Sequence, residues 1–262
     1  MDLGLSGREV VITGASRGIG QAIARGFAAE RCRVRLVARN GDALLTLADE
    51  LRQAHDCDVD TCAADLTQAG AVAAVCARWP NADILINNAG ATPRGDILQL
   101  DEEAWRAGWE LKIFGYINAT RAWYAHMQKR RSGVILNVIG MGAEKLEYGY
   151  AAGSTGNAAL VTFTRTVGSM SLDHGVRVLG VNPGWVETDK AVASLRRRTA
   201  EAGGDPDRWR DALGGWPGGR LIQPQEVADV VCFLASDRAG AVCGTVVAID
   251  GGFGARGYPR VN

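Results

Sequence analysis

A glycine-rich turn lies between a strand-like run and a helix-like run at the start of the chain. It reads TGASRGIG over residues 13–20, after the apolar residues 10–12 and at the opening of the stretch GIGQAIARGFAAE. A strand that turns sharply into a helix brings free backbone N–H groups and the positive end of the helix dipole together. Such a point attracts phosphate. We therefore predict a phosphate-binding loop that contains Gly14, Ser16, Arg17, Gly18, Ile19 and Gly20.

The rest of the chain alternates between strand-like and helix-like runs. A glycine string alone is equally consistent with a tight turn, so its context matters. Strand-like runs occur near 9–13, 33–37, 58–63, 83–87, 133–139, 177–182 and 245–249, and helix-like runs near 18–30, 41–54, 67–78, 102–130, 154–173 and 225–236. This alternation predicts an α/β fold, a Rossmann-type doubly wound parallel sheet with helices on both faces. Ligands bind such sheets at the carboxyl ends of the strands.

Composition limits the classes of partner and the number of domains. At 262 residues and 47% hydrophobic content, the chain fits one α/β domain over 1–262 better than two. Lys+Arg and Asp+Glu both count 29, so no net field favours nucleic acid or an anionic membrane. No apolar run approaches the ~20 residues of a membrane helix. The start of the chain does not resemble a signal peptide, so we expect a cytoplasmic protein.

The cysteines and histidines do not form a metal-binding pattern. The six cysteines lack CxxC pairing with histidines, so we expect free thiols in a reducing compartment and no metal site. One segment, residues 189–220, departs in composition because arginine, glycine and tryptophan crowd together there. An insertion after a strand end is typical of a mobile substrate lid, and a solvated helix with a loose loop is the alternative.

Five motifs connect the chain to a known family. They are TGASRGIG at 13–20, AADLT at 63–67, INNAG at 86–90, VNPGWVETD at 181–189, and FLASD…CGTVVAIDGG between 233 and 252. In this set and order the chain resembles the short-chain dehydrogenase/reductase family over nearly its whole length. The resemblance implies a nicotinamide cofactor and a carbonyl or alcohol substrate. It also implies three groups of cofactor contacts. Asp65 and Leu66 would lie near the adenine, and Asn88, Ala89 and Gly90 would line the central cleft. Pro183, Gly184 and Thr188 would contact the nicotinamide end.

The end of the second strand favours NADP(H) over NAD(H). Family members that bind NAD place an acidic residue there, which accepts hydrogen bonds from the ribose diol. Here Ala38 stands at that place and is followed by Arg39 and Asn40, while Arg17 lies within the glycine loop. An arginine can bind a 2′-phosphate through two hydrogen bonds, whereas an acid would repel it. The alternative is that either arginine is only a surface charge.

The catalytic residues of the family are absent. Family members use an Asn, a Ser, a Tyr and a Lys, and the resemblance aligns these with Lys112, Gly140, Gly153 and Asn157. The Tyr acts as general acid or base, the Ser hydrogen-bonds the reacting oxygen, and the Lys lowers the Tyr pKa and holds the ribose. The Asn supports a water that relays protons. Each of these positions is substituted in this chain.

Two features indicate a rearranged site. Tyr150 lies three residues before Gly153, with Tyr148 also close, and Asn and Lys exchange positions at Lys112 and Asn157. We therefore predict that Lys112, Tyr150 and Asn157 form the catalytic site. The alternatives are that Tyr150 only packs in its loop and that Lys112 extends along apolar surface to solvent.

Three classes of function remain open. The first is an NADP(H)-dependent oxidoreductase, the second a non-redox enzyme on the same fold, and the third a nucleotide-binding sensor or assembly protein. Trp185, Trp209 and Trp216 suggest an apolar or aromatic-lined pocket for a small molecule, although aromatic residues near a loop often only hold it in place. The apolar helix 102–130 and the family resemblance together predict a homotetramer or a homodimer.

Overall fold

The protein contains one seven-stranded parallel sheet, seen in a computed structural model that describes residues 1–256. The strand order is β3-β2-β1-β4-β5-β6-β7. The bounds are β1 (Glu9–Thr13), β2 (Arg33–Ala38), β3 (Val59–Ala63), β4 (Ile84–Asn87), β5 (Gly133–Val138), β6 (Val176–Pro183) and β7 (Val246–Ile249). The predicted fold class, a doubly wound α/β sheet, is confirmed, and the strand boundaries agree closely with the sequence pattern.

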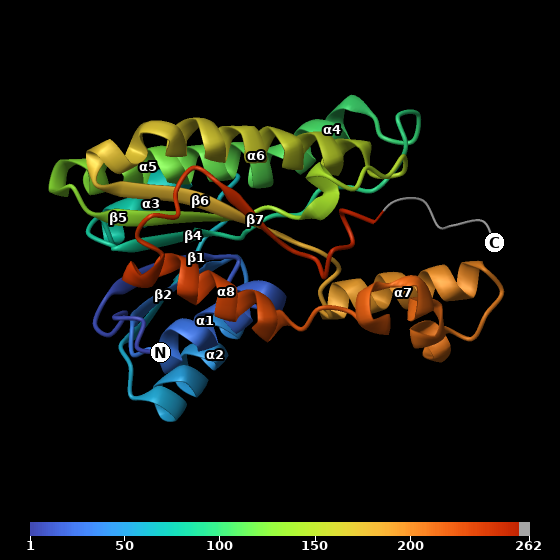
Figure 1. Cartoon of the computed structure of the whole chain (residues 1–262), viewed down its shortest axis with the longest axis horizontal. Coiled ribbons are helices and arrows are strands. Elements are labelled where there is room, and N and C mark those ends of the chain that lie inside the picture. Colours follow the sequence, from blue (N-terminus) through green and yellow to red (C-terminus); the bar gives the residue numbers. More distant parts are fainter. Residues whose placement is uncertain (257–262) are drawn as a thin grey trace.

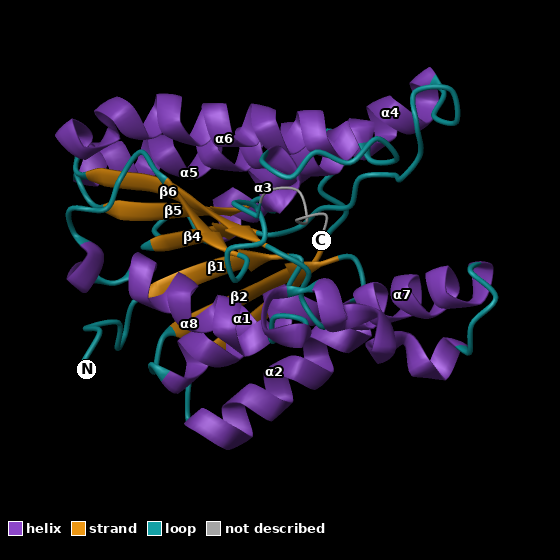
Figure 2. Ribbon diagram, turned by 45° about the vertical axis from the view of Figure 1, so that its right-hand side comes forward, coloured by secondary structure: helices purple, strands orange, loops and turns teal. Residues whose placement is uncertain are grey.

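Helices cover both faces of the sheet, as Figures 1 and 2 show. One layer holds α1, α2 and α8, and the other holds α3, α4, α5 and α6. The bounds are α1 (Gly18–Ala29), α2 (Gly41–His55), α3 (Ala71–Arg78), α4 (Glu102–Trp109), α5 (Gly115–Arg130), α6 (Ala151–Ser171), α7 (Asp189–Glu201) and α8 (Pro224–Ala235). Within residues 1–256, none of these helices is long and apolar enough to cross a membrane.

Strand β1 illustrates why both faces need a helical layer. Its side chains alternate between the faces, and all of them are buried. Val10 and Ile12 join the core beneath α1 and α8, while Val11 joins the core with Trp123 of α5 on the opposite face. A strand that is apolar on both faces is stable only when both are covered.

The order of the strands creates the crevice where a ligand can bind. The chain moves outward from β1 through β2 to β3, and then returns to start β4 on the other side of β1. The connections after β1 and β4 therefore leave in opposite directions. Such a switch point opens a crevice at the carboxyl ends of the strands, which is where the glycine loop and Asn88 lie.

Two helices differ from the sequence pattern at positions that matter for the site. The predicted helix 102–130 contains a π-helical turn at Glu110–Phe114, which separates α4 from α5. A π turn inserts one residue into the helix and changes the direction of the side chains there. The predicted helix 154–173 begins earlier, at Ala151, so Tyr150 stands at its N-cap.

Residues 189–220 form a small helical unit that extends beyond the sheet, at the right of Figure 1. Helix α7 leads into 3₁₀ turns at Pro206–Gly215 and Pro217–Gly219. A satellite core holds them together, made of Leu195, Trp209, Leu213 and Leu221. Trp209 is therefore a core residue of this unit.

A buried arginine fastens β6 to the end of α8. Arg177 is only 7% exposed, and its guanidinium donates to the carbonyl oxygens of Leu234, Ala235 and Ser236 at 2.6, 3.0 and 2.8 Å. These carbonyls lie at the C-terminal end of α8, where intrahelical donors run out and the helix dipole is negative. The arginine satisfies all three groups at once.

Replacing this arginine is expected to destabilise the fold. In Arg177→Met, three buried carbonyls lose their donor, and each unsatisfied group costs about 1–3 kcal/mol. We expect the free energy of unfolding to fall by about 3 kcal/mol or more, measured by urea denaturation. Arg238→Met is the control, because Arg238 is exposed and, among the described residues, its guanidinium donates to the Asp2 carbonyl alone, so the change should stay within about 0.5 kcal/mol. Equal stability of the two variants would contradict this role.

Candidate active site

The glycine loop is built so that a phosphate can approach the backbone. Helix α1 starts at Gly18 after Arg17, and no side chain caps its N-terminus. The N–H groups of the first turn therefore stay available to a ligand. Gly14 and Gly18 have φ values of 67° and 57°. A Cβ at Gly14 would come 2.8 Å from Ala89 Cα, and one at Gly20 would overlap the Gly14 carbonyl oxygen. Only glycine fits these places.

The loop is tied to the neighbouring strand end by Thr13 and Asn88. The Thr13 hydroxyl accepts hydrogen bonds from the backbone N–H groups of Asn88 and Ala89 at 2.9 and 3.0 Å. The Asn88 amide donates to the carbonyls of Thr13 and Gly14 at 3.0 and 3.1 Å. Asn88 thus holds the loop in shape, and Ala89 packs against it.

The end of β2 presents positive charge. Arg39 is exposed and forms no ion pair among the described residues, and the same is true of Arg17. Asn40 caps α2 by accepting from the Ala43 N–H at 3.1 Å. Asp65 accepts from the N–H and hydroxyl of Thr67, and these bonds, with a smaller effect of Arg39, hold the pKa of its carboxyl below the usual value. Arg39 and Asp65 are therefore neighbours at this edge.

The other end of the crevice lies between the glycine loop and the start of α7. Thr188 caps α7 by accepting from the Ala191 N–H at 3.3 Å. Its methyl group would lie 3.1 Å from a Cβ at Gly18, so the two segments almost touch. Pro183 ends β6, and the N–H of Gly184 donates to the Ile249 carbonyl at 2.9 Å. The Thr188 contact places the start of α7 beside the glycine loop, and the Gly184 bond ties the end of β6 to β7.

Lys112 points from the π turn toward the end of β5. Its Nζ donates to the carbonyl oxygen of Ile139 at 2.6 Å. Its aliphatic part lies against Gly90, where a Cβ would come 2.9 Å from Lys112 Cγ. Burial, and to a lesser degree the ammonium of Lys190, lowers the pKa of Lys112 to about 8. The side chain thus lies within the fold and does not run out to bulk solvent.

Asn157 lies beside the same backbone segment. It is 2% exposed, and its amide nitrogen donates to the Gly140 carbonyl at 3.4 Å. Its Oδ1 is buried and has no hydrogen-bond partner among the described residues. A buried acceptor without a donor is uncommon and indicates a place for a water or a ligand group. Lys112 and Asn157 therefore bind the adjacent carbonyls of Ile139 and Gly140.

The ring of Tyr150 fills the place of a missing side chain. A Cβ built on Gly153 would overlap the Tyr150 ring, which covers that face of α6. The ring edge also comes 3.2 Å from a Cβ at Gly142. The Tyr150 hydroxyl shares a 2.5 Å hydrogen bond with the hydroxyl of Thr92, which is buried in the segment after β4. The lack of a side chain at Gly153 thus makes room for the ring of the residue three positions earlier.

Charged side chains form a rim next to this tyrosine. The guanidinium of Arg94 lies over the Tyr150 ring, 4.8 Å from its centroid. Arg94 and Arg198 both donate to the carboxylate of Glu147, at 2.5 and 2.9 Å. Both guanidinium groups also face the ring of Trp185, at 5.6 and 5.5 Å from its centroid.

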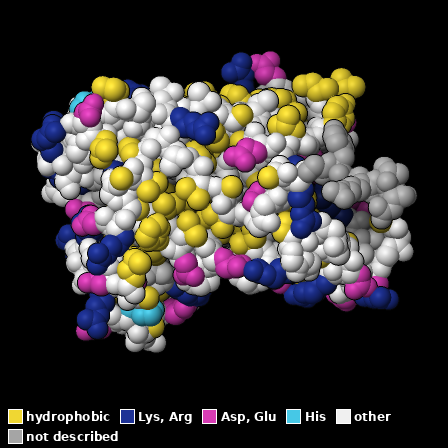
Figure 3. Space-filling model, viewed as in Figure 1, with side chains coloured by type: hydrophobic (Ala, Val, Ile, Leu, Met, Phe, Trp, Pro, Cys, Tyr) yellow, Lys and Arg dark blue, Asp and Glu magenta, His cyan; other side chains and the backbone are white. Residues whose placement is uncertain are grey.

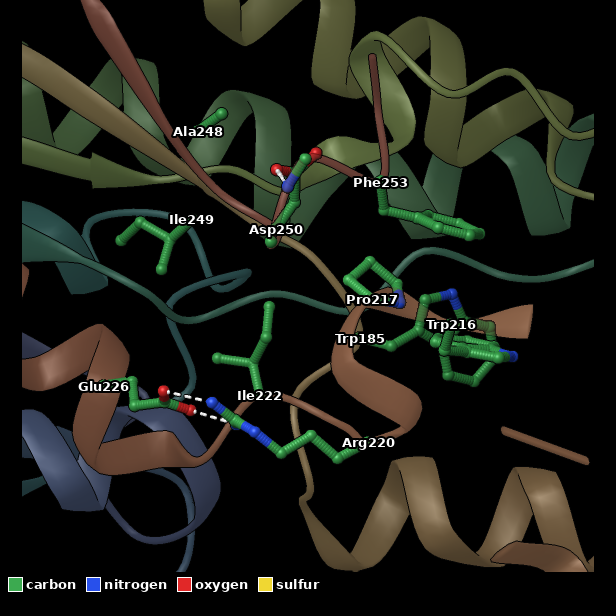
Figure 4. A pocket seen from close by; sticks show the side chains of 12 residues that line it. Trp185, Trp216, Pro217, Arg220, Ile222, Glu226, Ala248, Ile249, Asp250 and Phe253 are labelled. Carbon is green, nitrogen blue, oxygen red and sulfur yellow. Dashed lines mark hydrogen bonds and ion pairs between the residues drawn. The ribbon is translucent and has the colours of Figure 1, made fainter. Parts of the chain in front are cut away.

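A cavity of about 350 Å³ lies between the end of β7, the start of α8 and the helical unit 189–220 (Figure 4). Trp185 and Trp216 form one side, with ring centroids 5.2 Å apart, and Phe253 stacks on Trp216 at 5.3 Å. An ion pair between Arg220 and Glu226 closes the opposite side. Of the three tryptophans expected near a pocket, Trp185 and Trp216 line this cavity and Trp209 does not.

Comparison with known proteins places this arrangement in a family. The family model described as enoyl-(acyl carrier protein) reductase matches residues 14–254. The galactitol 2-dehydrogenase (L-tagatose-forming) of Cereibacter sphaeroides is 33% identical over 254 residues, covering 95% of this chain and 96% of that protein. The chain belongs to the short-chain dehydrogenase/reductase family. By family it is an oxidoreductase.

Two further matches agree with this assignment. The 3-oxoacyl-[acyl-carrier-protein] reductase FabG of Thermotoga maritima is 32% identical to this short-chain dehydrogenase/reductase, with 95% and 98% of the two chains covered. The crystal structure of L-sorbose reductase from Gluconobacter frateurii, complexed with NADPH and L-sorbose, superposes with a TM-score of 0.90 at 32% identity. That match covers 96% of this chain and 98% of the reductase.

Sequence reasoning missed four residues near the predicted catalytic group. Thr92 and Arg94 follow β4, which ends at the crevice, and residues after such a strand end are candidates for contact with a ligand. That signal was available in the sequence. The convergence of Glu147 and Arg198 was not, because they lie 51 residues apart and on different elements.

The glycine loop can be tested with one added methyl group. In Gly20→Ala the new Cβ would overlap the Gly14 carbonyl and come 2.5 Å from Asn88 Nδ2, so the loop must distort. We expect affinity for a phosphate-bearing dinucleotide to fall at least tenfold, measured by quenching of tryptophan fluorescence. Gly214→Ala is the control, because a Cβ there meets no atom within 4 Å. Unchanged affinity in Gly20→Ala would refute the tight fit.

Proposed function

We propose that this short-chain dehydrogenase/reductase is an NADP(H)-dependent oxidoreductase that interconverts a carbonyl and an alcohol on a small molecule. Tyr150 acts as the proton donor or acceptor. The observation that carries the proposal is the Tyr150 ring lying in the space above Gly153, with its hydroxyl against Thr92. Gly153 is the position that the family resemblance assigns to the catalytic tyrosine.

The residues present fit an NADP(H) molecule along the crevice. The open N-terminus of α1 and the loop containing Gly14, Ser16, Gly18, Ile19 and Gly20 would hold the pyrophosphate. Arg17 and Arg39 would bind the 2′-phosphate, with Asn40, Asp65 and Leu66 near the adenosine. The central cleft and nicotinamide end would be lined by Asn88, Ala89 and Gly90 and by Pro183, Gly184 and Thr188. When bound, the nicotinamide supplies or accepts the hydride. The solved L-sorbose reductase complex contains NADPH, which supports this choice.

The proton chemistry falls to Tyr150 and its neighbours. Thr92 shares a hydrogen bond with the tyrosine hydroxyl and so fixes its direction. The Lys112 ammonium stabilises negative charge that develops on the tyrosine or on the substrate oxygen. Asn157 offers its unpaired Oδ1 to a relay water or to a hydroxyl of the ribose. Lys112 and Asn157 thus serve the two roles from exchanged positions.

The helical unit 189–220 would act as a lid over a small substrate. The apolar or aromatic part of this substrate would contact Trp185. We place the enzyme in the cytoplasm and expect it to assemble as a homotetramer or a homodimer. Figure 3 supports an assembly surface, because hydrophobic side chains gather in front of β7 and α8. Phe233 of α8 is 39% exposed, and Ala248 of the edge strand β7 is exposed as well.

The cofactor preference follows from the charges at the end of β2. NADPH should bind at least tenfold more tightly than NADH, because one charge-assisted contact is worth about 1.5–3 kcal/mol. Titrating both nucleotides against wild type and Arg39→Ala measures this preference. Arg33→Ala, an exposed arginine at the opposite end of the same strand, is the matched control. Equal affinity of wild type for NADPH and NADH would reject the assignment.

The catalytic group is tested by Tyr150→Phe and Lys112→Met. General acid–base and electrostatic groups contribute about 100-fold or more, so each variant should lose that factor in kcat with a substrate found by screening. Tyr148→Phe should keep wild-type turnover, because Tyr148 is 76% exposed. Near-wild-type turnover in both test variants would mean that the catalytic group is lost and not relocated. A nucleotide-binding sensor would then be the better interpretation.

The lowered pKa of Lys112 predicts that the reaction rate depends on pH. Lys112 carries its charge below its pKa of about 8 and loses it above that value. The reaction rate should therefore fall as pH rises through about 8. Lys112→Met should remove this limb of the profile, whereas Tyr148→Phe should retain it. A wild-type rate that is flat between pH 7 and 9 would speak against a role for the ammonium.

The assembly prediction can be checked by sedimentation at micromolar concentration. We expect a species of four chains, or of two, related by two-fold axes. The single chain has a mass of 27.7 kDa, so observing only that mass would refute the prediction. Phe233→Glu places a charge in the exposed apolar surface on α8 and should shift the population toward the single chain.

A further inference from the structure

We propose that the substrate of this enzyme carries a carboxylate, which Arg94 and Arg198 bind next to Tyr150. The Glu147 carboxylate takes this anion position in the structure. The inference deepens the proposed function, since it relies on Tyr150 being the group that meets the reacting carbonyl or alcohol.

The two arginines converge on one carboxylate from separate parts of the fold. Arg94 lies between β4 and α4, whereas Arg198 belongs to α7. Arg94 Nη2 donates to Glu147 Oε2 at 2.5 Å, and Arg198 Nη2 donates to Oε1 at 2.9 Å. Each oxygen of a single carboxylate thus has its own guanidinium. This is a geometry that arginine provides for any carboxylate, whether it comes from the protein or from a ligand.

The position of the two guanidinium groups relates them to the chemistry. Arg94 lies over the Tyr150 ring, and both Arg94 and Arg198 face the ring of Trp185. A bound molecule could therefore place its carboxylate between the arginines and its reacting oxygen toward the tyrosine hydroxyl. Trp185, which stands against Trp216 in Figure 4, would provide a flat apolar wall along the rest of the molecule.

The charges around this place favour an anion. The three residues Arg94, Arg198 and Glu147 together carry one net positive charge. Lys190, near the start of the same helix α7, forms no ion pair among the residues that the structure describes. Burial, with the positive charges of Arg17 and Arg94, lowers the pKa of the Lys190 ammonium. A cofactor phosphate would neutralise the positive charge of Arg17. The positive charge at Arg94 would then remain for the substrate.

Glu147 can give way to a ligand at small cost. It lies in the loop segment between β5 and α6, and its side chain is 40% exposed, so the core does not hold it in place. Ion pairs this exposed contribute little stability, because water solvates both partners well when they separate. The apolar part of a ligand bound along Trp185 would add burial of its own to the charge-assisted bonds of its carboxylate. The alternative is that the three charges only tie α7 to the loops.

Paired acids and esters distinguish these alternatives. We would measure binding of levulinate against methyl levulinate, and of benzoylformate against methyl benzoylformate, by calorimetry on protein loaded with NADP⁺. The oxidised cofactor prevents reduction of these ketones, so binding is measured without turnover. In wild type at least one acid should bind tenfold or more tightly than its ester, because the charge-assisted bonds require the carboxylate. Arg94→Gln and Arg198→Gln should each remove this preference, with the affinity for the ester unchanged.

Two further variants sharpen the test. Glu147→Gln removes the competing carboxylate and should tighten binding of the acid severalfold. Arg197→Gln should leave the acid preference intact, because the neighbouring Arg197 on α7 is exposed and pairs with Glu201. If Arg94→Gln and Arg198→Gln weaken acid and ester equally, the arginines only hold the lid, and the proposal is wrong.

Failure of this inference can be told apart from failure of the proposed function. If acid and ester bind equally in wild type, or if neither acid binds at millimolar concentration, the anion site is refuted. Oxidation of NADPH by a neutral ketone would still uphold the oxidoreductase. Conversely, an acid preference without any NADPH oxidation across the panel would leave the anion site in place and count against the redox reaction.

Discussion

The placement of the Lys112 ammonium determines the shape of the region around it. A buried positive charge without an acceptor is costly, and the free carbonyl of Ile139 just beyond β5 provides that acceptor. The side chain reaches it from the π turn at Glu110–Phe114, where the direction of the side chains departs from that of a regular α-helix. Its methylene groups also require that residue 90 be a glycine, since a Cβ there would collide with them. The position of this one side chain therefore connects the π turn, the Ile139 carbonyl and Gly90.

Close packing also determines the position of the Tyr150 ring. Tyr150 and Gly153 share one volume, so a side chain at 153 and the present position of the Tyr150 ring exclude each other. The volume is filled from a different point in the chain, at the N-cap of α6 and not within its first turn. The family resemblance aligns Gly153 with a tyrosine, and the packing here fills the space beside Gly153 with an aromatic ring supplied from three residues earlier. The proposed chemistry depends on the ring and its hydroxyl, whichever position supplies them.

How far the sequence could predict this protein depends on the range of the interactions. The alternating apolar runs and the glycine loop predicted the sheet, its helical layers and the crevice, because these follow from local periodicity and turn chemistry. The exchange of Lys112 and Asn157 was also visible in the sequence, and the structure places both on the adjacent carbonyls of Ile139 and Gly140. The hydrogen bond between Thr92 and Tyr150 joins residues 58 apart and depends on tertiary packing, which a pattern along the chain does not encode.

Helix α7 links the two ends of the crevice mechanically. At its start Thr188 caps the helix and lies against Gly18 of the glycine loop, and ten residues later Arg198 binds Glu147 beside the tyrosine. Ten residues of α-helix span about 15 Å, and a helix of this length moves as a stiff rod. A displacement of α7 along its axis would therefore change the contacts at both ends together. The phosphate end and the proposed anion end are thus joined by one continuous helix, so occupancy of either end should favour the same position of the helix.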